Sequence, residues 1–306
     1  MANCLVVGGN GFLGSHLVDR LAADGHRVRA FDVYTTPQQY TSLGVECWVG
    51  DFLNDTDLDR ATAGQQYVFH FLSTTTPSAA DNNPVRDIET NLMQSVRLFQ
   101  SCAEHGVERV YFASTGGAIY GLNAPGLLSE THAAEPVSPY GIGKLAIERY
   151  LDYFRLKHGL ESVALRISNP YGTRQHPVRK QGLIPIVLRQ IANGEPVTQY
   201  GDGSMVRDYL FVADLVEMIA RFVDAQPKYP VYNLGSGVGH SVAEVLSLIR
   251  AVTGRELDIQ RQPTPATFVP RVILDTSRFV TEFGAAAATP LEVGIAATWK
   301  EIHAHV

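Results

Sequence analysis

The sequence predicts an α/β fold in which a doubly wound parallel sheet carries helices on both faces. Short apolar segments alternate with helical stretches through the first half of the chain. These segments are continuously apolar, which is typical of parallel strands buried on both faces. Charged residues make up only 18% of the 306 residues, below the usual quarter. This low fraction favours a deeply covered sheet or an oligomer interface.

Five apolar segments are the predicted strands, and helices separate them. The strands are expected at residues 3–9, 26–32, 66–73, 109–115 and 161–168. A short helix is expected over 14–25, where Gly25 closes it. Two longer helices are expected from about Val85 to His105 and from about Tyr140 to His158, because apolar residues recur there at helical spacing. Their apolar faces pack on the sheet, and part of them is a candidate dimer interface.

The residue composition of the chain changes after about Asn169, where Gly and Pro become frequent. This half reads as short elements joined by long loops, and such loops often bind ligands. We therefore predict two domains, residues 1–168 and residues 169–306. The second is expected to be a smaller α/β domain that binds mainly substrate, with some of its segments returning to the first.

Charge and cysteine content narrow the class of protein. The net charge is -6 with no long basic run, so nucleic acid and membrane surfaces are not expected as partners. The three cysteines, Cys4, Cys47 and Cys102, form no CxxC pair, which favours a reducing compartment. The N-terminal "MANCLVVGG" has no charged region before a short apolar run, and no apolar stretch is long enough to span a membrane. We expect a cytoplasmic protein with no metal site.

A glycine-rich turn follows the first predicted strand. In "VVGGNGFLG", Gly8, Gly11 and Gly14 permit a tight turn, close approach of the backbone to a pyrophosphate, and close helix–strand packing. The next helix offers free N–H groups and its positive dipole end to the phosphates. The second strand ends in Asp32, whose carboxylate can accept both ribose hydroxyls and would repel the extra phosphate of NADP. The turn predicts a Rossmann-type domain that binds NAD.

Two other polar residues near the strands are ambiguous. Asp51 follows a further strand, which lies between the predicted strands 26–32 and 66–73. There it is either a turn or helix N-cap residue or an adenine contact. His70 lies inside an apolar strand, which favours a core histidine over a catalytic one.

Tyr140 and Lys144 lie four residues apart at the start of a helical stretch, so they share one face. A nearby ammonium stabilises a phenolate and lowers the pKa of the phenol, so this pair is a candidate acid/base. The lysine can also hold the nicotinamide ribose. A Tyr-x-x-x-Lys pair is common in helices for structural reasons. Because this pair follows a dinucleotide-binding motif in the same chain, the catalytic interpretation is favoured.

These features together resemble the extended short-chain dehydrogenases/reductases, and most closely the UDP-glucose 4-epimerase group of the NAD-dependent epimerases/dehydratases. The resemblance covers nearly the whole chain. It rests on "GGNGFLG", "STGGAIYG", "YGIGK", "RISNPYG", "GDGSMVRDYLFVADL" and "YNLGSG", in that order.

The resemblance implies a role for each matching residue. Tyr140 would be the acid/base and Lys144 its partner. The residues implied to contact NAD are Gly8, Gly11, Phe12, Leu13, Asp32, Asp51, Phe52, Phe71, Leu72, Ser73, Asn91, Ser114, Tyr140 and Lys144. Those implied to contact the nucleotide part of a UDP-sugar are Asn169, Leu183, Thr198, Tyr200 and Arg207. Arg207 would clamp a phosphate, and its alternative is a surface salt bridge with Asp208.

The chain departs from the family pattern after the predicted strand 109–115. The family places an assisting hydroxyl five residues before the glycine of "YG", where this chain has Gly116. Thr115 is the preferred catalytic hydroxyl, and Ser114 is expected to contact cofactor or substrate; alternatively, both merely end the strand. The related 4,6-dehydratases place acidic residues directly after the threonine, whereas this chain has "GGA". None of these three can shuttle a proton, which disfavours dehydration.

A second departure lies in "TPATFVPRVILD". The family usually carries an arginine ahead of this point that grips the diphosphate, and here Arg271 or Arg261 is a candidate substitute. Val272 falls near the position that limits space around the sugar C2 substituent. A small residue there would leave room for an N-acetyl group.

The sequence thus predicts an NAD-dependent UDP-sugar 4-epimerase that acts through a 4-keto intermediate in a cleft between the two domains. UDP-glucose/UDP-galactose and the N-acetylhexosamine pair are the expected substrates, and uronic acids stay open. The alternatives are another nucleotide-sugar epimerase, a reductase or dehydratase of the superfamily, or a non-catalytic NAD-binding sensor. A homodimer through helices near residues 85–105 and 140–158 is expected.

Overall fold

The computed structural model describes residues 1–122, 126–175, 181–223, 225–265, 268–286 and 288–304. The chain forms two compact units. Unit 1 comprises Met1–Thr115, Ser138–Arg166 and Val216–Tyr232, and unit 2 comprises Gly116–Val137, Ile167–Leu215 and Asn233–Val306. The division of the chain into cofactor and substrate domains at residues 168 and 169 stays a prediction.

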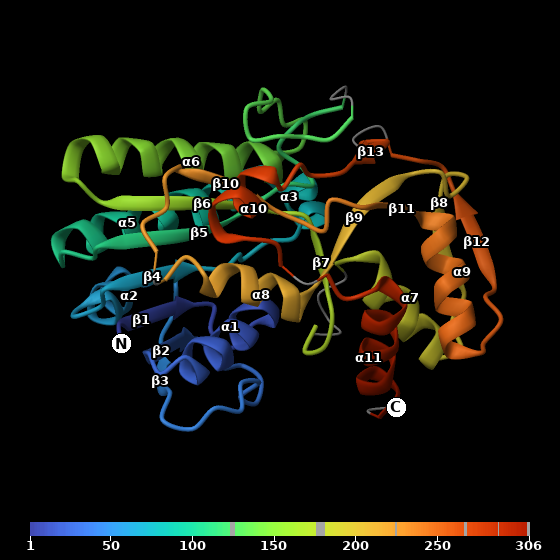
Figure 1. Cartoon of the computed structure of the whole chain (residues 1–306), viewed down its shortest axis with the longest axis horizontal. Helices are drawn as coiled ribbons and strands as arrows, with labels where there is room; N and C mark the ends of the chain where they lie inside the picture. The colour runs from blue at the N-terminus through green and yellow to red at the C-terminus, as the bar shows by residue number, and fades with distance from the viewer. Residues whose placement is uncertain (123–125, 176–180, 224, 266–267, 287, 305–306) are drawn as a thin grey trace. The chain divides into compact units, whose positions relative to one another are not determined.

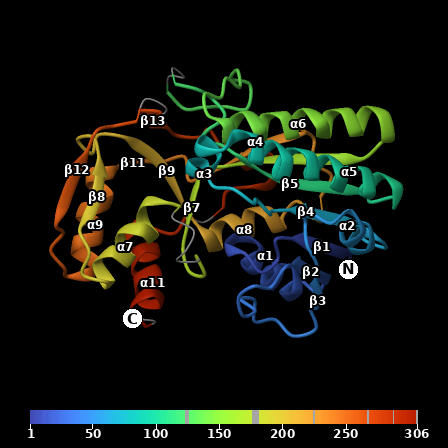
Figure 2. The same cartoon turned by 180° about the vertical axis from the view of Figure 1, so that it is seen from behind.

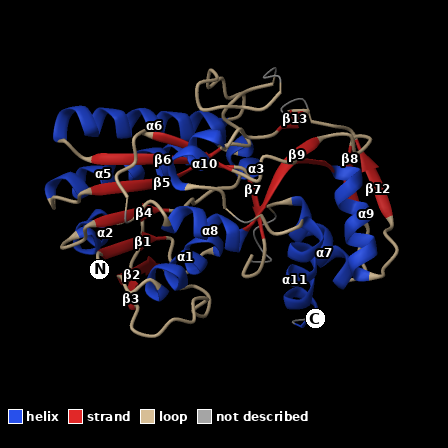
Figure 3. Ribbon diagram, in the orientation of Figure 1, coloured by secondary structure: helices blue, strands red, loops and turns tan. Residues whose placement is uncertain are grey.

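A seven-stranded sheet in the order β10-β6-β5-β4-β1-β2-β3 organises unit 1; its strands are labelled in Figure 1, and strands are drawn red in Figure 3. Its strands are β1 (Asn3–Val7), β2 (Arg27–Asp32), β3 (Glu46–Val49), β4 (Tyr67–His70), β5 (Arg109–Thr115), β6 (Glu161–Ile167) and β10 (Val231–Leu234). β1 pairs in parallel with both β2 and β4, β2 with β3, and β4 with β5. The strand order therefore reverses next to β1, and the predicted doubly wound α/β fold is confirmed.

Helices cover both faces of this sheet because alternate strand residues point to opposite sides. On one side, Leu5, Phe31 and Phe112 form a core with residues of α2 (Asp55–Thr62), α5 (Met93–Glu104) and α6 (Pro139–His158). On the other side, α1 (Phe12–Ala23) packs on β1 and β2. α5 and α6 lie side by side in both views (Figures 1 and 2).

Local sequence signals fix both ends of α6. The Ser138 hydroxyl caps the helix by accepting the N–H of Gly141 at 3.2 Å, and Pro139 occupies the first turn. Gly159 closes the helix with φ +68°, which only glycine adopts without strain. Between them, Ile147, Leu151 and Phe154 are buried as the helical spacing predicts. Tyr140 therefore sits in the first turn of a rigid helix.

The helix predicted over 85–105 is not uniform. It consists of α4 (Pro84–Asp87), a π-helical turn η1 (Ile88–Leu92) and α5 (Met93–Glu104), preceded by α3 (Pro77–Asn82). A π turn inserts one extra residue into the helix, and such turns frequently mark functional sites. The spacing of apolar residues cannot reveal this insertion, because one extra residue rotates the apolar face of the helix by less than a full turn.

Unit 2 has smaller sheets and its own core. β9 (Val206–Phe211) pairs with β11 (Gly239–Ser241), β13 (Arg271–Val272) and β7 (Asn169–Tyr171). β8 (Val197–Tyr200) pairs in parallel with β12 (Ile259–Gln262). The helices are α7 (Leu183–Ala192), α9 (Val242–Thr253), α10 (Ser277–Phe283) and α11 (Leu291–Ala304), while α8 (Val212–Ala220) runs from unit 2 into unit 1. Among the described residues, none of the helices combines the length and apolar character needed to cross a membrane.

The first helix packs against the glycine turn without any intervening side chain. A Cβ atom on Gly14 would stand 2.0 Å from the carbonyl oxygen of Gly8. The N–H groups of Gly8 and Gly9 both donate to the Phe31 carbonyl at 2.9 and 3.0 Å, so the turn is fixed on β2 and cannot retreat. Glycine at position 14 is required by close packing.

Gly14→Ala is expected to destabilise the protein by about 1–3 kcal/mol, the usual range for overpacking a close contact. The control is Ala23→Gly at the exposed end of the same helix, which loses only helix propensity, roughly 1 kcal/mol or less. Chemical denaturation of both variants measures the difference. Wild-type stability in Gly14→Ala would contradict the packing described here.

Candidate functional site

The turn between β1 and α1 presents bare backbone. A Cβ atom on Gly8, which has φ +88°, would stand 2.9 Å from the Leu72 nitrogen, and one on Gly11 would stand 3.1 Å from the Gly8 carbonyl. Gly11 is the N-cap of α1 and has no side chain to cap it, so Phe12 and Leu13 begin the helix with their N–H groups directed out of the first turn. The turn has the shape and dipole that a dinucleotide pyrophosphate requires.

Asp32 stands at the end of β2 with its carboxylate fixed by backbone donors. The N–H groups of Asn10 and Val33 donate to its two oxygens at 3.1 and 2.8 Å. The buried Asn10 side chain also holds the loop after β2, because it donates to the carbonyls of Thr36 and Pro37 at 3.2 Å and accepts the Gln39 N–H at 2.8 Å. The sequence analysis overlooked Asn10, which lies inside the glycine motif.

The residues predicted to flank adenine have different environments. Asp51 is exposed, and its carboxylate accepts the N–H of Leu53 at 2.9 Å as a turn residue does. Phe52 is 2% exposed and packs in the core, with its ring centroid 5.3 Å from that of His70. Its side chain is therefore not available to a ligand, and only its backbone could meet adenine.

The loop after β4 lies against the glycine turn. The N–H of Phe71 donates to the Val7 carbonyl at 3.0 Å, Leu72 meets Gly8, and the Ser73 hydroxyl donates to the Thr75 carbonyl at 2.9 Å. All three residues are half-buried.

Asn91, in the π turn η1, braces this loop. Its side-chain oxygen accepts the N–H of Thr74 at 2.9 Å, and its amide donates to the Thr75 hydroxyl and to Asp87, both at 2.8 Å. Asp87 is 4% exposed and also accepts the Thr75 hydroxyl. The sequence analysis did not single out Asp87, because the patterns gave no sign that a carboxylate would be buried there.

His70 is a core residue, as the apolar strand indicates. Its Nε2 shares a hydrogen bond of 2.8 Å with the Ser95 hydroxyl, and burial lowers its pKa to about 3, with a smaller contribution from Lys144. The ring is therefore neutral at physiological pH.

Ser114 and Thr115 end β5 and have different partners. The buried Ser114 hydroxyl donates to Glu148 at 2.5 Å, and Glu148 forms a two-pronged ion pair with Arg166 of β6 at 3.1 and 2.8 Å. The hydroxyl of Thr115 has no hydrogen-bond partner among the described residues. The Ser114 hydroxyl is thus committed to the interior, and the Thr115 hydroxyl is not.

Lys144 is buried beside the end of β5. Its ammonium donates to the Ala113 carbonyl at 2.8 Å and lies 4.6 Å from the Phe112 ring centroid and 5.7 Å from that of Tyr140. Burial lowers the pKa of Lys144 to about 8, while Asp87 and then Glu148 act in the opposite direction. The lysine is therefore charged at neutral pH but close to losing its proton.

The pKa of Tyr140 differs from the expectation that the nearby ammonium lowers it. Burial, and secondarily the charge of Asp87, raise the pKa of the phenol to about 12. The Lys144 ammonium bonds to a backbone carbonyl, and burial and the Asp87 charge set the direction of the shift in the phenol's pKa. The phenol is protonated at neutral pH in this arrangement.

The residues predicted to bind substrate all fall in unit 2. The Asn169 amide donates to the Asp208 carbonyl at 3.1 Å, and the Arg207 guanidinium donates to the Val206 carbonyl at 2.9 Å. Burial lowers the pKa of Arg207. Asp208 is fully buried and accepts N–H groups of Ser236, Gly237 and Leu274, so the alternative of a surface ion pair with Arg207 is excluded.

Arg271 and Arg207 lie on neighbouring strands but on opposite faces. Arg271 pairs with Val206, and Val272 with Arg207. Because paired residues of adjacent strands share a face and successive residues alternate, the Arg207 face carries Val272 and not Arg271. Arg271 is exposed, and Val272 is 2% exposed. The register gives no support to Arg271 as a second ligand of the phosphate that Arg207 would hold.

The remaining predicted contacts come from α7 and β8. Leu183 begins α7 and packs against the core of unit 2. Thr198 and Tyr200 share one face of β8, since they are two residues apart. The Tyr200 ring is 42% exposed and meets Phe268 edge to face at 5.6 Å.

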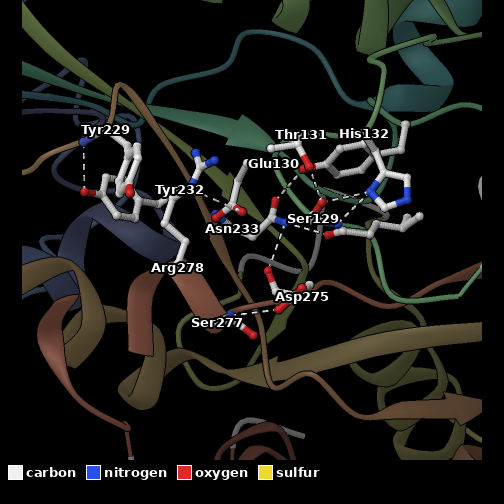
Figure 4. A network of polar contacts seen from close by, with 12 residues as sticks. Ser129, Glu130, Thr131, His132, Tyr229, Tyr232, Asn233, Asp275, Ser277 and Arg278 are labelled. Carbon is white, nitrogen blue, oxygen red and sulfur yellow. Dashed lines mark hydrogen bonds and ion pairs between the residues drawn. The ribbon is translucent and has the colours of Figure 1, made fainter. Parts of the chain in front are cut away.

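A polar network in unit 2 holds the segment that follows β5 (Figure 4). Asn233, which is fully buried, donates its amide to the carbonyls of Leu128 and Asp275 at 2.6 and 3.1 Å and its N–H to Glu130 at 2.8 Å. Its side-chain oxygen accepts the Tyr120 hydroxyl at 2.6 Å. The side-chain amide of Asn233 thereby joins the motifs "STGGAIYG" and "YNLGSG". This contact cannot be predicted from the sequence, because the two motifs lie far apart in the chain.

Comparisons with known proteins agree with this geometry. Residues 4–235 match the NAD dependent epimerase/dehydratase family. The UDP-glucose 4-epimerase of Mycolicibacterium smegmatis is 31% identical over 301 residues, which is 96% of each chain. The crystal structure of the Thermotoga maritima UDP-glucose 4-epimerase with UDP-glucose is 31% identical with a TM-score of 0.92 and covers 99% of each chain. That of the Thermus thermophilus enzyme with NAD is 32% identical with a TM-score of 0.91, covering 99% of this chain and 100% of that one.

Arg166→Met is expected to cost about 3–5 kcal/mol of stability, because it leaves the Glu148 carboxylate buried without its cation. Replacing both partners, as Glu148→Leu with Arg166→Met, should restore most of that loss, since no buried charge remains. Urea unfolding of the single and double variants measures the difference. A double variant no more stable than Arg166→Met would contradict this account of the pair.

Proposed function

Because the chain belongs to the NAD dependent epimerase/dehydratase family, we propose that it is an NAD-dependent UDP-sugar 4-epimerase acting through a 4-keto sugar. The observation that carries the proposal is the arrangement of unit 1. The glycine turn after β1, the Asn91-braced loop after β4 and the Ser114–Thr115 end of β5 all follow the carboxyl ends of neighbouring parallel strands, and Lys144 bonds to the last of these. In such folds, this edge is where ligands bind.

The residues of this edge fit NAD. Gly8 and Gly11 leave the backbone bare for a pyrophosphate, and the Asp32 carboxylate stands at the end of β2 to accept ribose hydroxyls. Asn91 would act by holding the loop around Leu72 and Ser73 in place. Lys144 would hold the nicotinamide ribose. When bound, NAD accepts hydride from the sugar and returns it.

The protein's own residues would manage the proton and the position of the sugar. Tyr140 would first release its own proton to solvent. As a phenolate it would then take the proton of the C4 hydroxyl as the C4 carbonyl forms, and give it back after the sugar has turned over. The charged Lys144 would favour the phenolate, and the Thr115 hydroxyl would share a hydrogen bond with the reacting oxygen. In unit 2, Arg207 would clamp the diphosphate and Asn169, Leu183, Thr198 and Tyr200 would meet the nucleotide.

Proton NMR with UDP-glucose, UDP-GlcNAc and UDP-glucuronate tests this function. We expect the 4-epimer of at least one sugar to appear with no net reduction of NAD, and turnover of UDP-GlcNAc would support the interpretation of Val272. Tyr140→Phe should lose about 100-fold or more in kcat, the loss that removal of a general acid/base typically causes, while NAD still binds. Thr115→Ala should lose far more rate than Ser114→Ala, whose hydroxyl is committed to Glu148.

Three results would count against the proposal. A silent spectrum with all three sugars, despite bound NAD, would favour another nucleotide sugar or a sensor. Full activity in Tyr140→Phe would refute the acid/base role. Equal losses in the two hydroxyl variants would remove the distinction between Ser114 and Thr115.

We further propose that the chain forms a homodimer through the outer face of α4, η1, α5 and α6. This face carries exposed apolar side chains: Val85, Ile88, Met93, Ile142, Tyr150, Tyr153 and Leu156. On α6 their spacing of 8, 3 and 3 residues keeps them on one side of the helix. Exposed apolar side chains on helices that pack side by side are typical of an interface.

Leu156→Glu, at a side chain that is 84% exposed, is expected to shift the dimer toward monomer by placing a charge in this face. The control is Leu43→Glu, at a residue 96% exposed on a loop outside it. Light scattering across a dilution series measures the mass. A monomeric wild type, or a dimer equally affected by both variants, would contradict the proposed interface.

A further inference from the structure

A carboxylate is buried beside the proposed acid/base pair. Asp87 ends α4, the short helix ahead of the π turn η1, and is 4% exposed. Its Oδ1 accepts both the Thr75 hydroxyl and the Asn91 amide. Both donors are neutral, and among the described residues no lysine, arginine or histidine forms an ion pair with Asp87. A buried carboxylate whose charge is not compensated is costly, so its retention calls for a partner at longer range.

The other oxygen of Asp87 faces α6. A Cβ atom on Gly143 would stand 2.9 Å from Oδ2, so the missing side chain at position 143 makes room for the carboxylate. The next residue along α6 is Lys144, and α3, α4 and η1 all pack on α6. The carboxylate is thus brought to the turn of α6 that carries both Tyr140 and Lys144.

Lys144 needs such an anion. It is 8% exposed, and within the described part of the chain its ammonium bonds to one group, the neutral carbonyl of Ala113. Among the described residues, two carboxylates act on its charge: Asp87 from α4 and Glu148 one turn along α6. Arg166 of β6 stands behind Glu148, and His70 of β4 is the other titratable group that Lys144 affects. His70 is neutral, and Glu148 is already paired with Arg166. Asp87 is the anion that no other cation offsets.

We propose that Asp87 is a positioning residue of the cofactor and proton-transfer site: fixed by Thr75 and Asn91 against Gly143, its carboxylate keeps the buried Lys144 in its ammonium form, able to bind a cofactor ribose and to support Tyr140. This rests on the proposed roles of Lys144 and Tyr140. The π turn contributes to this arrangement. It follows Asp87 directly and places Asn91 where its side chain bonds both to Asp87 and to the loop after β4.

The test is the pH dependence of NAD binding, measured by calorimetry on nucleotide-free protein between pH 6 and 10. In the wild type, affinity should fall as Lys144 loses its proton above about pH 8. Asp87→Asn keeps oxygen and nitrogen atoms for Thr75 and Asn91 but removes the charge. Removing an anion lowers the pKa of an ammonium, so the fall should begin at lower pH, with affinity about tenfold weaker than wild type at pH 8 and similar at pH 6.

Two further variants serve as controls for the interpretation of Asp87→Asn. Asp81→Asn makes the same change at an exposed carboxylate on α3 and should leave the profile unchanged. Gly143→Ala pushes the carboxylate away from α6 without removing it, so it should shift the profile in the same direction as Asp87→Asn and serves if that variant does not fold.

Superimposable profiles for wild type and Asp87→Asn would overturn the proposal, and so would a loss of affinity equal at every pH, which is what a merely structural role gives. Because the readout is NAD binding, it does not depend on the epimerase reaction. A wild type that binds NAD with this pH profile but turns over no sugar would sink the proposed function and leave the role of Asp87 standing.

Discussion

The buried contact between Glu148, Arg166 and Ser114 is the constraint on which the site depends. It ties α6 to β6 and to the end of β5, so that the helix cannot slide or rotate on the sheet. Lys144 lies one turn before Glu148 and bonds to the residue before Ser114, so the same contact fixes where the ammonium stands. An ion pair in the interior adds little stability over apolar packing, and its value here is in specifying one position of the helix.

Charge at this edge of unit 1 is divided between two carboxylates with different tasks. Glu148 is neutralised by Arg166 and holds structure, whereas Asp87 has only neutral donors and acts at longer range on Lys144. The high pKa of Tyr140 has the same origin, because burial and the Asp87 charge both favour the neutral phenol. As the proposed acid/base, Tyr140 would stay protonated until another positive charge arrives, which would suit a reaction that starts only with cofactor and sugar in place.

The features that could be predicted from the sequence are those that nearby residues determine. The apolar strands, the glycine turn and α6 follow from spacing and capping, and the doubly wound sheet follows from them. Sequence reasoning could not predict the π turn, since apolar spacing does not resolve one inserted residue. It could not place Asp87, Asn10 or Asn233, whose partners are distant in the chain. Ser114 bonds to Glu148 and Arg271 lies on the strand face opposite Arg207, while the catalytic role of Thr115 stays a prediction. The pKa of Tyr140 is raised where the neighbouring ammonium was expected to lower it, because helical spacing reveals neither the burial of the phenol nor the carboxylate that another helix places near it.

The most direct test of the central claim is the fate of the hydrogen at sugar C4. The measurement is turnover, in ordinary water, of whichever UDP-sugar proves active, carrying deuterium at C4 and followed by NMR. If hydride leaves C4 and returns to it while Tyr140 handles only the hydroxyl proton, the 4-epimer will keep its deuterium at C4, and Tyr140→Phe will form this product about 100-fold or more slowly. Loss of the deuterium to solvent during epimerisation would contradict this account, because it would mean that C4 is inverted through a carbanion and not by oxidation and reduction.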